Sequence, residues 1–277
     1  MSCIAFHPTK HNILAVSFIE DISFDQRAEI SGRSWETHVL IIKFTEDQEV
    51  TIVQVLETPM EVTRLVWHPE RPEIVIGGCW SGQMTFWDLN DESSKIVDQN
   101  SDNPMGGDDD DDEAVNVMDD DSAKKIYKYR AQVLSEIRIS HRMPVEDMKW
   151  MPINIQLTRK SNNVGNVTHI VTCGEDGQVL FWDVRNTFKE NRHLLTKKQP
   201  FEPIIRVQLM RPDGSGMLGV TRLLFDPKQE DTLFWATSDE GDIVLADWSV
   251  KPPGGEGKGR PGAKKDETPP EYIQFSY

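Results

Sequence analysis

Apolar residues in this chain gather in short segments that end in turn residues, a pattern typical of β-strands. One phrase of this kind occurs three times, as IGGCWSGQMTFWD at 76–88, VTCGEDGQVLFWD at 171–183 and ATSDEGDIVLADW at 236–248. Each copy contains two apolar stretches separated by a turn with a glycine, namely Gly82, Gly177 and Gly241. Because glycine takes the positive φ of a tight hairpin without steric cost, the phrase predicts three similar hairpins.

A second phrase precedes each hairpin and consists of a short apolar strand, an aromatic residue, one variable residue and proline. Its four copies are Phe6-His7-Pro8, Trp67-His68-Pro69, Trp150-Met151-Pro152 and Phe225-Asp226-Pro227. Proline cannot donate to a strand ladder, so we expect each strand to end there and a turn to begin. We therefore expect repeats that start near residues 1, 62, 145 and 219.

The first repeat lacks the Trp-Asp ending but keeps the strand pattern. Strands are predicted at about 2–6, 12–18, 38–44 and 50–56, with a polar excursion at 19–36. Repeated hairpins that end in Trp and Asp are typical of β-propeller blades. The sequence thus predicts an all-β, WD-repeat β-propeller with about three and a half blades within residues 1–250.

An open partial propeller would leave apolar edges unpaired, whereas closed propellers have about four to eight blades. The chain is therefore interpreted as a fragment of a larger propeller, expected to have seven blades. Pairing with another propeller half is the alternative. The Gly/Pro/Lys-rich stretch within 251–277 is expected to be a loop that leads into a further strand at its end.

The formal net charge of −16 is concentrated in residues 91–121, which contain the acidic run 108–113 and three further aspartates at 119–121. Few apolar residues occur there, so a disordered acidic insertion is expected, either solubilising or a docking segment for a basic partner. The charge argues against nucleic acid as a partner, and the run lacks the alternating ligands of a Ca²⁺ loop. After the insertion, residues 122–139 carry Ile126, Tyr129, Val133 and Ile137 at helical spacing, which predicts a short amphipathic helix.

Composition argues against several other classes of protein. The apolar runs are too short for a membrane span, and no signal peptide is visible at the first residues. Cys3, Cys79 and Cys173 are widely spaced in strand-like segments. We expect them to be small core residues in a reducing, intracellular setting, with no metal or disulfide role.

The residues that resemble catalytic groups have a structural interpretation. In a complete WD repeat, a His, a Ser or Thr, an Asp in the hairpin turn and a Trp form a buried hydrogen-bonded tetrad. The likeness places these roles on His141, Thr172, Asp176 and Trp182, and the blade signature on Trp87, Asp88 and Asp183. The second and fourth repeats lack the tetrad. No catalytic, cofactor-binding or metal-binding residues are predicted, so we expect no enzyme activity.

The repeats resemble the WD-repeat propeller of dynein intermediate chains from residue 1 to about 248. The resemblance rests on MSCIAFHPTKHNILAVSF, on VTRLVWHPERPEIVIGGCWSGQMTFWDL, and on SHRMPVEDMKWMP with VTHIVTCGEDGQVLFWDVR. The polar insertion between Pro152 and His169 is most similar to the axonemal inner-arm type.

Membership in that family would imply a non-catalytic scaffold subunit without a cofactor that supports motor assembly and ciliary motility. Its expected partners are a dynein heavy chain, a second intermediate chain, light chains and other axonemal proteins, with no membrane contact. Its expected location is the cytoplasm, the cytoskeleton and the axoneme of a cilium or flagellum.

Other functions remain open at this point. A general WD-repeat adaptor, such as a ubiquitin-ligase substrate receptor or a chromatin-complex subunit, is the main alternative, and a propeller hydrolase is a distant third. Trp80 is expected at a hairpin tip, where it either anchors a partner or folds back on the neighbouring blade. If Trp80 is no anchor, the insertions 19–36 and 153–167 become the better interface candidates.

Overall fold

The structure of the chain is a computed structural model. It describes residues 2–29, 37–45, 49–96, 126–153, 157, 166–197, 199–211, 214–226, 228, 232–249 and 271–273. Residues 97–121 of the acidic insertion and 251–270 of the Gly/Pro/Lys-rich stretch therefore lie outside the described residues.

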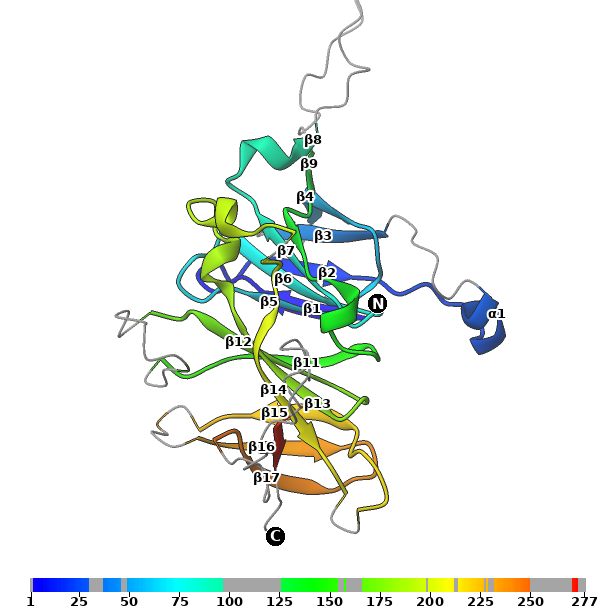
Figure 1. The fold of residues 1–277 in the computed structure, drawn as a ribbon. Coiled ribbons are helices and arrows are strands. Elements are labelled where there is room, and N and C mark those ends of the chain that lie inside the picture. Colours follow the sequence, from blue (N-terminus) through cyan, green and yellow to red (C-terminus); the bar gives the residue numbers. More distant parts are fainter. Residues whose placement is uncertain are drawn as a thin grey trace, which may run out of the picture.

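Four mainly antiparallel sheets follow one another along the chain (Figure 1). In order of pairing, the first sheet contains β1 (Cys3–Phe6), β2 (Ile13–Ser17), β3 (Thr37–Phe44), β4 (Val50–Thr58), β9 (Tyr127–Arg130) and β8 (Lys95–Ile96). The second contains β10 (Val133–Leu134), β7 (Met84–Asp88), β6 (Ile74–Cys79) and β5 (Val62–Trp67).

The third and fourth sheets complete the stack. The third contains β11 (Val145–Trp150), β12 (His169–Gly174), β13 (Gln178–Asp183), β14 (Pro203–Leu209) and β18 (Glu271–Ile273). The fourth contains β15 (Val220–Leu224), β16 (Leu233–Ser238) and β17 (Ile243–Asp247). The described helices are short, namely α1 (Phe24–Glu29), η1 (Glu92–Ser94), η3 (Ile137–Ile139), η4 (Val184–Thr187) and η5 (Arg192–Leu194).

The arrangement confirms the predicted all-β, partial-propeller fold. The core forms three apolar clusters, one at each of the three boundaries between neighbouring sheets. The first strands of the four sheets, β1, β5, β11 and β15, contact one another in that order. Each sheet therefore packs its face on the next around a common side, as propeller blades do.

The same side-chain contact joins the first sheet to the second and the second to the third. Trp67 at the end of β5 packs on the His7 ring at 4.8 Å, and its indole N–H donates to the Ala5 carbonyl at 3.0 Å. Trp150 at the end of β11 packs on the His68 ring at 4.7 Å, and its indole N–H donates to the Trp67 carbonyl at 2.8 Å. Each tryptophan thus fixes its strand to the turn of the preceding sheet.

The third boundary has no tryptophan in this place. Phe225 is the equivalent residue, and it packs with Phe234 and Trp248 at centroid distances of 5.9 and 6.1 Å. Met151 takes the place of the histidine and is buried in the same apolar cluster. At this position the third and fourth sheets meet through apolar side chains, while Asp147 of β11 accepts from the backbone N–H of Leu223 on β15 at 2.9 Å.

The predicted amphipathic helix at 122–139 is wrong for its described part. Residues 127–130 form β9, residues 133–134 form β10, and only 137–139 form a single 3-10 turn. Tyr129 and Val133 are buried, but Ile126 and Ile137 are 48% and 56% exposed. The helical spacing arose by chance, because strand pairing with β4 and β7 overrode the local periodicity.

The disordered insertion was predicted to start at residue 91, but the first residues of this range belong to the fold. Residues 92–94 form η1, and β8 pairs antiparallel with β9, which in turn extends the first sheet in parallel with β4. Residues 91–96 are thus ordered parts of the fold.

The two outermost sheets expose apolar faces. Phe6, Leu14, Ile42 and Ile52 align across β1–β4; Phe6 and Ile52 at the two ends are 67% and 39% exposed, whereas Leu14 is buried. On the fourth sheet, a second apolar row has the same character and consists of Leu224, Trp235 and Leu245. Paired residues lie on the same side of a sheet, so each row lies on one face. We call these two rows the end faces.

We predict that the end faces make the isolated chain self-associate, because exposed apolar faces of this kind mark interaction surfaces or aggregation sites. Phe6→Glu combined with Trp235→Glu should shift the chain toward monomer in sedimentation velocity. The melting temperature should change little, because both side chains are already exposed. A monomeric wild-type chain, or an unchanged association state in the variant, would contradict this interpretation.

We also predict that acid destabilises the two turns that follow β1 and β5, which contain His7 and His68. Nδ1 of His68 accepts from the backbone N–H groups of Glu70 and Arg71 at 3.2 and 3.1 Å, which requires an unprotonated Nδ1. Burial lowers the pKa of His68, and also that of His7, whose Nδ1 accepts from its own turn in the same way. A histidine with a lower pKa in the folded state stabilises the fold fully at pH values above its unfolded pKa of about 6.5. This contribution is lost as the pH falls from that value through the folded-state pKa.

The melting temperature should therefore fall between pH 7.5 and pH 5.5. His68→Asn keeps an acceptor near the position of Nδ1 but cannot titrate, so this variant should show a smaller fall. His193→Asn is the matched control because His193 is exposed. An equal fall in all three proteins would rule out His68 as a contributor.

Candidate functional site

The four predicted tetrad residues lie together in the third sheet. Nε2 of His141 lies 2.8 Å from the Thr172 hydroxyl, and the Trp182 indole N–H donates to the same hydroxyl at 2.9 Å. Nδ1 of His141 lies 3.1 Å from a carboxylate oxygen of Asp176. The donors and acceptors match if His141 carries its proton on Nδ1, because Thr172 then accepts from Trp182 and donates to Nε2.

The carboxylate of Asp176 is also held by the backbone. It accepts from the N–H of Arg142 at 2.8 Å and from the N–H and side-chain amide of Gln178 at 3.2 and 3.0 Å. Burial alone would raise the pKa of Asp176, but the hydrogen bond from His141 and the backbone N–H groups of Arg142 and Gln178 together lower it. The cluster is closed and fully paired, which suits a structural role rather than acid–base chemistry.

The second and fourth repeats, which lack the tetrad, are held by other hydrogen bonds. The Trp87 indole N–H donates to the Glu57 carbonyl of the first sheet at 3.1 Å. In the fourth sheet, the Ser238 hydroxyl accepts from the N–H groups of Glu240 and Asp242 in its own turn. The signature aspartates Asp88 and Asp183 each accept from a backbone N–H two residues later, at 3.0 Å in both cases. They therefore close the turns that follow β7 and β13.

A buried charge cluster at Asp91 escaped the sequence analysis. The Asp91 carboxylate accepts from the Ser93 N–H and hydroxyl, from the Arg192 guanidinium at 2.6 Å, and lies 3.3 Å from the Lys189 ammonium. Burial opposes ionisation, but the bonds from Ser93 and Arg192 hold the pKa of Asp91 well below its usual range. The cluster joins the end of the second sheet to η5, and the acidic composition around Asp91 hid it.

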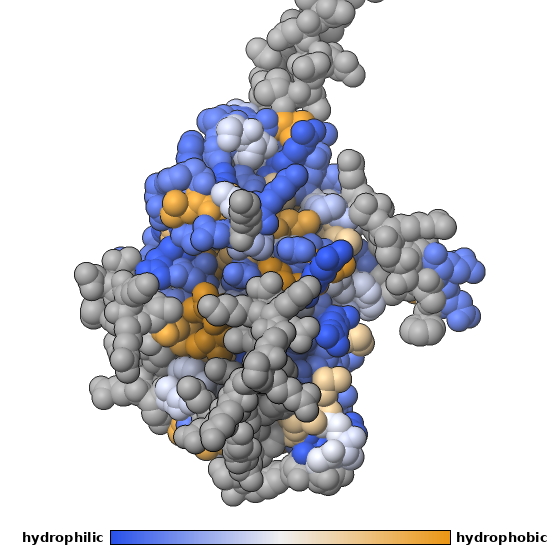
Figure 2. Space-filling view, in the orientation of Figure 1, coloured by the Kyte–Doolittle hydropathy of each residue, from blue (hydrophilic) through white to orange (hydrophobic). Residues whose placement is uncertain are grey.

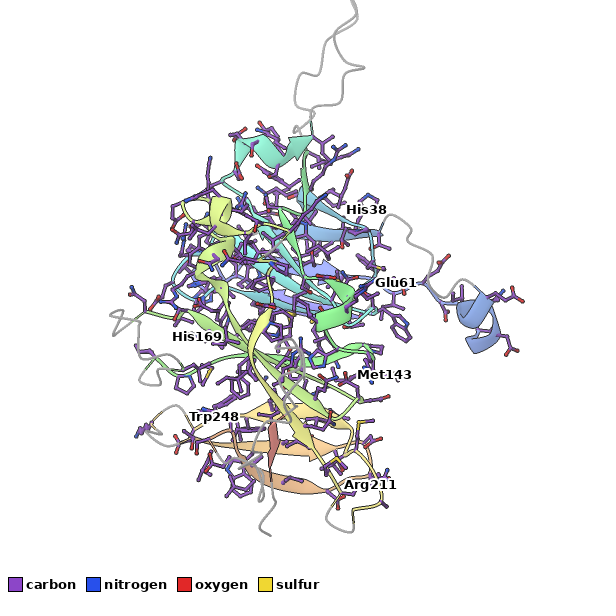
Figure 3. All side chains as sticks on the ribbon, viewed as in Figure 1. His38, Glu61, Met143, His169, Arg211 and Trp248 are labelled. Atoms are coloured by element: carbon purple, nitrogen blue, oxygen red, sulfur yellow. The ribbon has the colours of Figure 1, made fainter. Side chains whose placement is uncertain are left out.

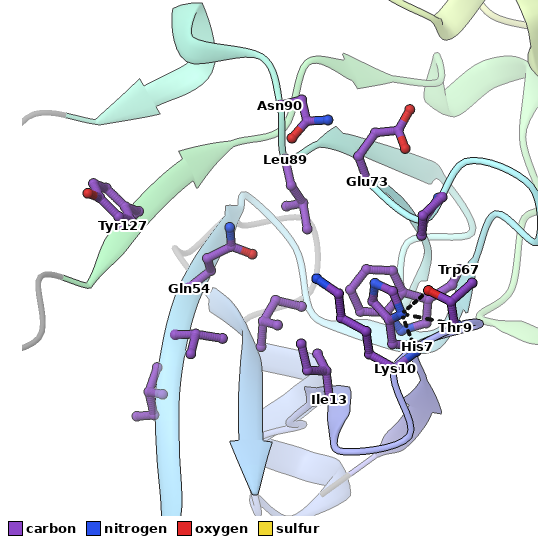
Figure 4. A pocket seen from close by; sticks show the side chains of 14 residues that line it. His7, Thr9, Lys10, Ile13, Gln54, Trp67, Glu73, Leu89, Asn90 and Tyr127 are labelled. Atoms are coloured by element: carbon purple, nitrogen blue, oxygen red, sulfur yellow. Dashed lines mark hydrogen bonds between the residues drawn. The ribbon is translucent and has the colours of Figure 1, made fainter. Parts of the chain in front are cut away.

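A pocket of about 670 Å³ lies where the first two sheets meet (Figure 4). Its wall is mainly apolar and includes Ile13, Ile41, Trp67 and Leu89. The His7 ring also lines it, but its Nδ1 is already occupied by the backbone N–H groups of its own turn. Lys10, Glu73 and Tyr127 also line the pocket, so its walls carry titratable as well as apolar side chains.

The described residues contain no cluster of three or more His, Cys, Asp or Glu side chains that could hold a metal ion. Within the same residues, no helix has the length and apolar character to cross a membrane. Cys79 and Cys173 are buried free thiols, and burial raises the pKa of Cys79 to about 12. A thiol with such a pKa is a poor nucleophile.

Trp80 lies in the turn between β6 and β7 and is 41% exposed. Its backbone N–H donates to the Glu61 carbonyl at 2.8 Å, just before β5 begins. The same turn contains Gly82 at φ +81°, and a Cβ there would lie 2.2 Å from the His141 carbonyl oxygen. Only glycine fits so close to the next sheet, so the turn is fixed against the segment that precedes β11.

We predict that His141→Ala destabilises the fold by about 1–3 kcal/mol, because it leaves Thr172 and Asp176 without a buried partner. Thermal or urea unfolding measures the change. His193→Ala serves as the control, since the side chain is exposed. An equal free energy of unfolding for the His141 variant and the wild type would show that the tetrad does not stabilise the fold.

Comparison with known proteins agrees with this geometry. The family model described as "Dynein axonemal intermediate chain 3 WD40 domain" matches residues 1–215. The chain is 27% identical over 192 residues to dynein axonemal intermediate chain 3 of Mus musculus, an alignment that covers 67% of the chain and 20% of that protein. It is 26% identical over 269 residues to the Danio rerio protein of the same name, covering 87% of the chain and 26% of the relative.

A more distant likeness reaches another axonemal intermediate chain. The chain is 21% identical over 250 residues to dynein axonemal intermediate chain 2 of Rattus norvegicus, covering 90% of the chain and 30% of that protein. The chain thus spans about a fifth to a third of the curated relatives it matches. The WD-repeat sheets and the match over residues 1–215 together show that the chain belongs to the family of the dynein axonemal intermediate chain 3 WD40 domain.

Proposed function

We propose that the chain forms part of a non-catalytic scaffold subunit of an axonemal dynein motor, most similar to the inner-arm type. In this role it docks on the tail of a heavy chain and supports assembly and ciliary motility at the axoneme. A second intermediate chain, light chains and other axonemal proteins are the further proposed partners. The match of the WD40 family model over residues 1–215 is the observation that carries the proposal.

The architecture supports a scaffold role. The titratable side chains of the tetrad, His141 and Asp176, are bonded to each other and to neighbouring groups, which suits a structural role. In the view of Figure 2, the surface is mostly hydrophilic with separate apolar patches, which suits several contacts with partner chains.

The end faces add a specific element to the proposal. Each is an apolar sheet face like those buried between the four sheets, so a further WD blade is the natural cover for each. The four sheets would then belong to a closed propeller.

Purification of the tagged full-length protein from ciliated cells tests the proposal. We predict that an axonemal dynein heavy chain co-purifies. Trp67→Ala should abolish most of this association, because loss of a buried tryptophan costs about 3–5 kcal/mol and separates the first two sheets. Trp67→Phe should retain part of it, and the exposed residue in Lys43→Ala provides the neutral control. Ubiquitin-ligase or chromatin subunits in place of a heavy chain would favour the adaptor alternative and contradict the proposal.

A further inference from the structure

The boundary between the second and third sheets is closed by an aromatic side chain from a loop. Phe188 lies in the connection between β13 and β14 and is 7% exposed. The centroid of its ring lies 5.7 Å from that of the His68 ring and 6.2 Å from that of the Phe86 ring. The guanidinium of Arg71 lies over the same ring, 4.3 Å from its centroid. We call this arrangement the Phe188 site.

Each residue around Phe188 has a counterpart one sheet earlier. His7 and Lys10 follow Phe6 at the same spacing at which His68 and Arg71 follow Trp67. At Nδ1, both histidines accept the backbone N–H groups of the residues two and three positions later, so the two turns have the same local structure. Strand pairing makes Ile41 the counterpart of Phe86. The aligned rows are Ala5, Ala15 and Ile41 on β1–β3, and Val66, Ile76 and Phe86 on β5–β7.

All three counterparts line the pocket between the first two sheets, which we call the His7 pocket (Figure 4). The pocket lies at the end of the sheets where the inner strands finish. Figure 3 shows His169 and Trp248 at this end of the sheets and Glu61 and Met143 at the other. The pocket has a volume of about 670 Å³ where the Phe188 site holds its ring. The same position is therefore filled at one boundary and open at the preceding one.

The connection that follows β7 does not supply the missing ring. It leaves the second sheet through η1 and contributes β8 and β9 to the edge of the first sheet. Tyr127 of β9 lines the pocket, but its ring packs against the Lys95 ammonium at 3.8 Å and is 37% exposed. Residues 89–126 contain no Phe, Tyr or Trp. That stretch of the connection therefore has no aromatic side chain equivalent to Phe188.

The Phe188 site also includes an ion pair that the His7 pocket lacks. Arg71 pairs with Glu190, which lies two residues after Phe188, at 2.8 Å. Glu73 lines the His7 pocket, but its carboxylate is bonded to Nε of Arg71 at 3.0 Å. Lys10, the counterpart of Arg71, forms no salt bridge with any carboxylate that the structure describes. Within the described residues, its ammonium is a cation of the pocket wall without an acidic partner.

We infer that the His7 pocket receives an aromatic side chain of a partner protein, and that an Asp or Glu two residues after it pairs with Lys10. The ring packs on His7 and Ile41, and Lys10 lies over its face as Arg71 lies over Phe188. Burial of the ring supplies most of the affinity, because an exposed ion pair contributes little. The inference rests on the proposed function, in that the partner segment belongs to the dynein assembly.

Photo-crosslinking from the edge of the pocket tests the inference in the assembled complex. A lysine analogue that carries a diazirine replaces Asn90, an exposed residue that lines the pocket, in the tagged full-length protein expressed in ciliated cells. The purified complex is irradiated, and mass spectrometry identifies the crosslinked peptide. The expected peptide belongs to another subunit of the assembly and contains Phe, Tyr or Trp followed two residues later by Asp or Glu.

Binding of a synthetic, fluorescent copy of that peptide to the purified full-length protein separates docking from mere proximity. Replacing the aromatic residue of the peptide with Ala should weaken binding about tenfold or more. Lys10→Glu should weaken it about threefold or more, whereas Lys10→Arg should keep it within about twofold of wild type. Lys228→Glu is the matched control and should also stay within about twofold, because Lys228 is exposed in the corresponding turn of the fourth sheet. Circular dichroism of each variant checks that the fold is retained.

The outcomes for the pocket and for the proposed function can be told apart. If the heavy chain co-purifies but position 90 gives no crosslink, or crosslinks to a peptide of this same protein or to one without an aromatic residue, the inference is wrong and the proposed function stands. Unchanged binding after Lys10→Glu, or after loss of the aromatic residue of the peptide, would contradict the inference as well. If no heavy chain co-purifies with wild type, the proposed function fails. A peptide of another partner with the expected aromatic and acidic residues, and with binding that depends on Lys10, would then still support the pocket.

Discussion

The packing of each inner strand on the turn of the preceding sheet is the contact on which the rest of the structure depends. Trp67 and Trp150 each combine a ring contact with a histidine and an indole hydrogen bond to a backbone carbonyl of the sheet before. A single bond of this kind contributes about 1 kcal/mol, but the buried indole adds several times that amount. The contact fixes both the distance and the rotation between sheets, so the blades stack in a regular way.

Because these contacts fix the sheets, the turns on the other side gain a defined position. The Gly82 turn is tied to His141, which leads into the next sheet, and the Asp176 turn is tied to the N–H of Arg142, which leads into its own sheet. Recognition can then reside in exposed side chains of rigid turns rather than in long flexible loops. The tetrad has a corresponding function, since it couples the turn of the third sheet to its own buried strands.

Much of this architecture was predictable from sequence, because it rests on residues with special backbone or side-chain needs. Glycine at Gly82, proline after Trp67 and the His–Thr–Asp–Trp spacing of the third repeat each have few structural alternatives.

The elements that were missed depend on distant pairing. Residues 127–130 have helical apolar spacing, yet they form a strand because the edge of β4 was available, and no local pattern encodes that edge. Asp91 looked like part of a solvated acidic run, because its partners Lys189 and Arg192 lie about a hundred residues away.

The central claim is that these four sheets are consecutive WD blades of a closed propeller within an axonemal dynein subunit. Cryo-electron microscopy of the purified complex containing the full-length protein tests it most directly. The account predicts that further WD blades of the same subunit cover both end faces, with Phe6 and Trp235 buried at those boundaries. A complex in which the four sheets stand alone with Phe6 and Trp235 in solvent, or in which a different fold covers them, would contradict it.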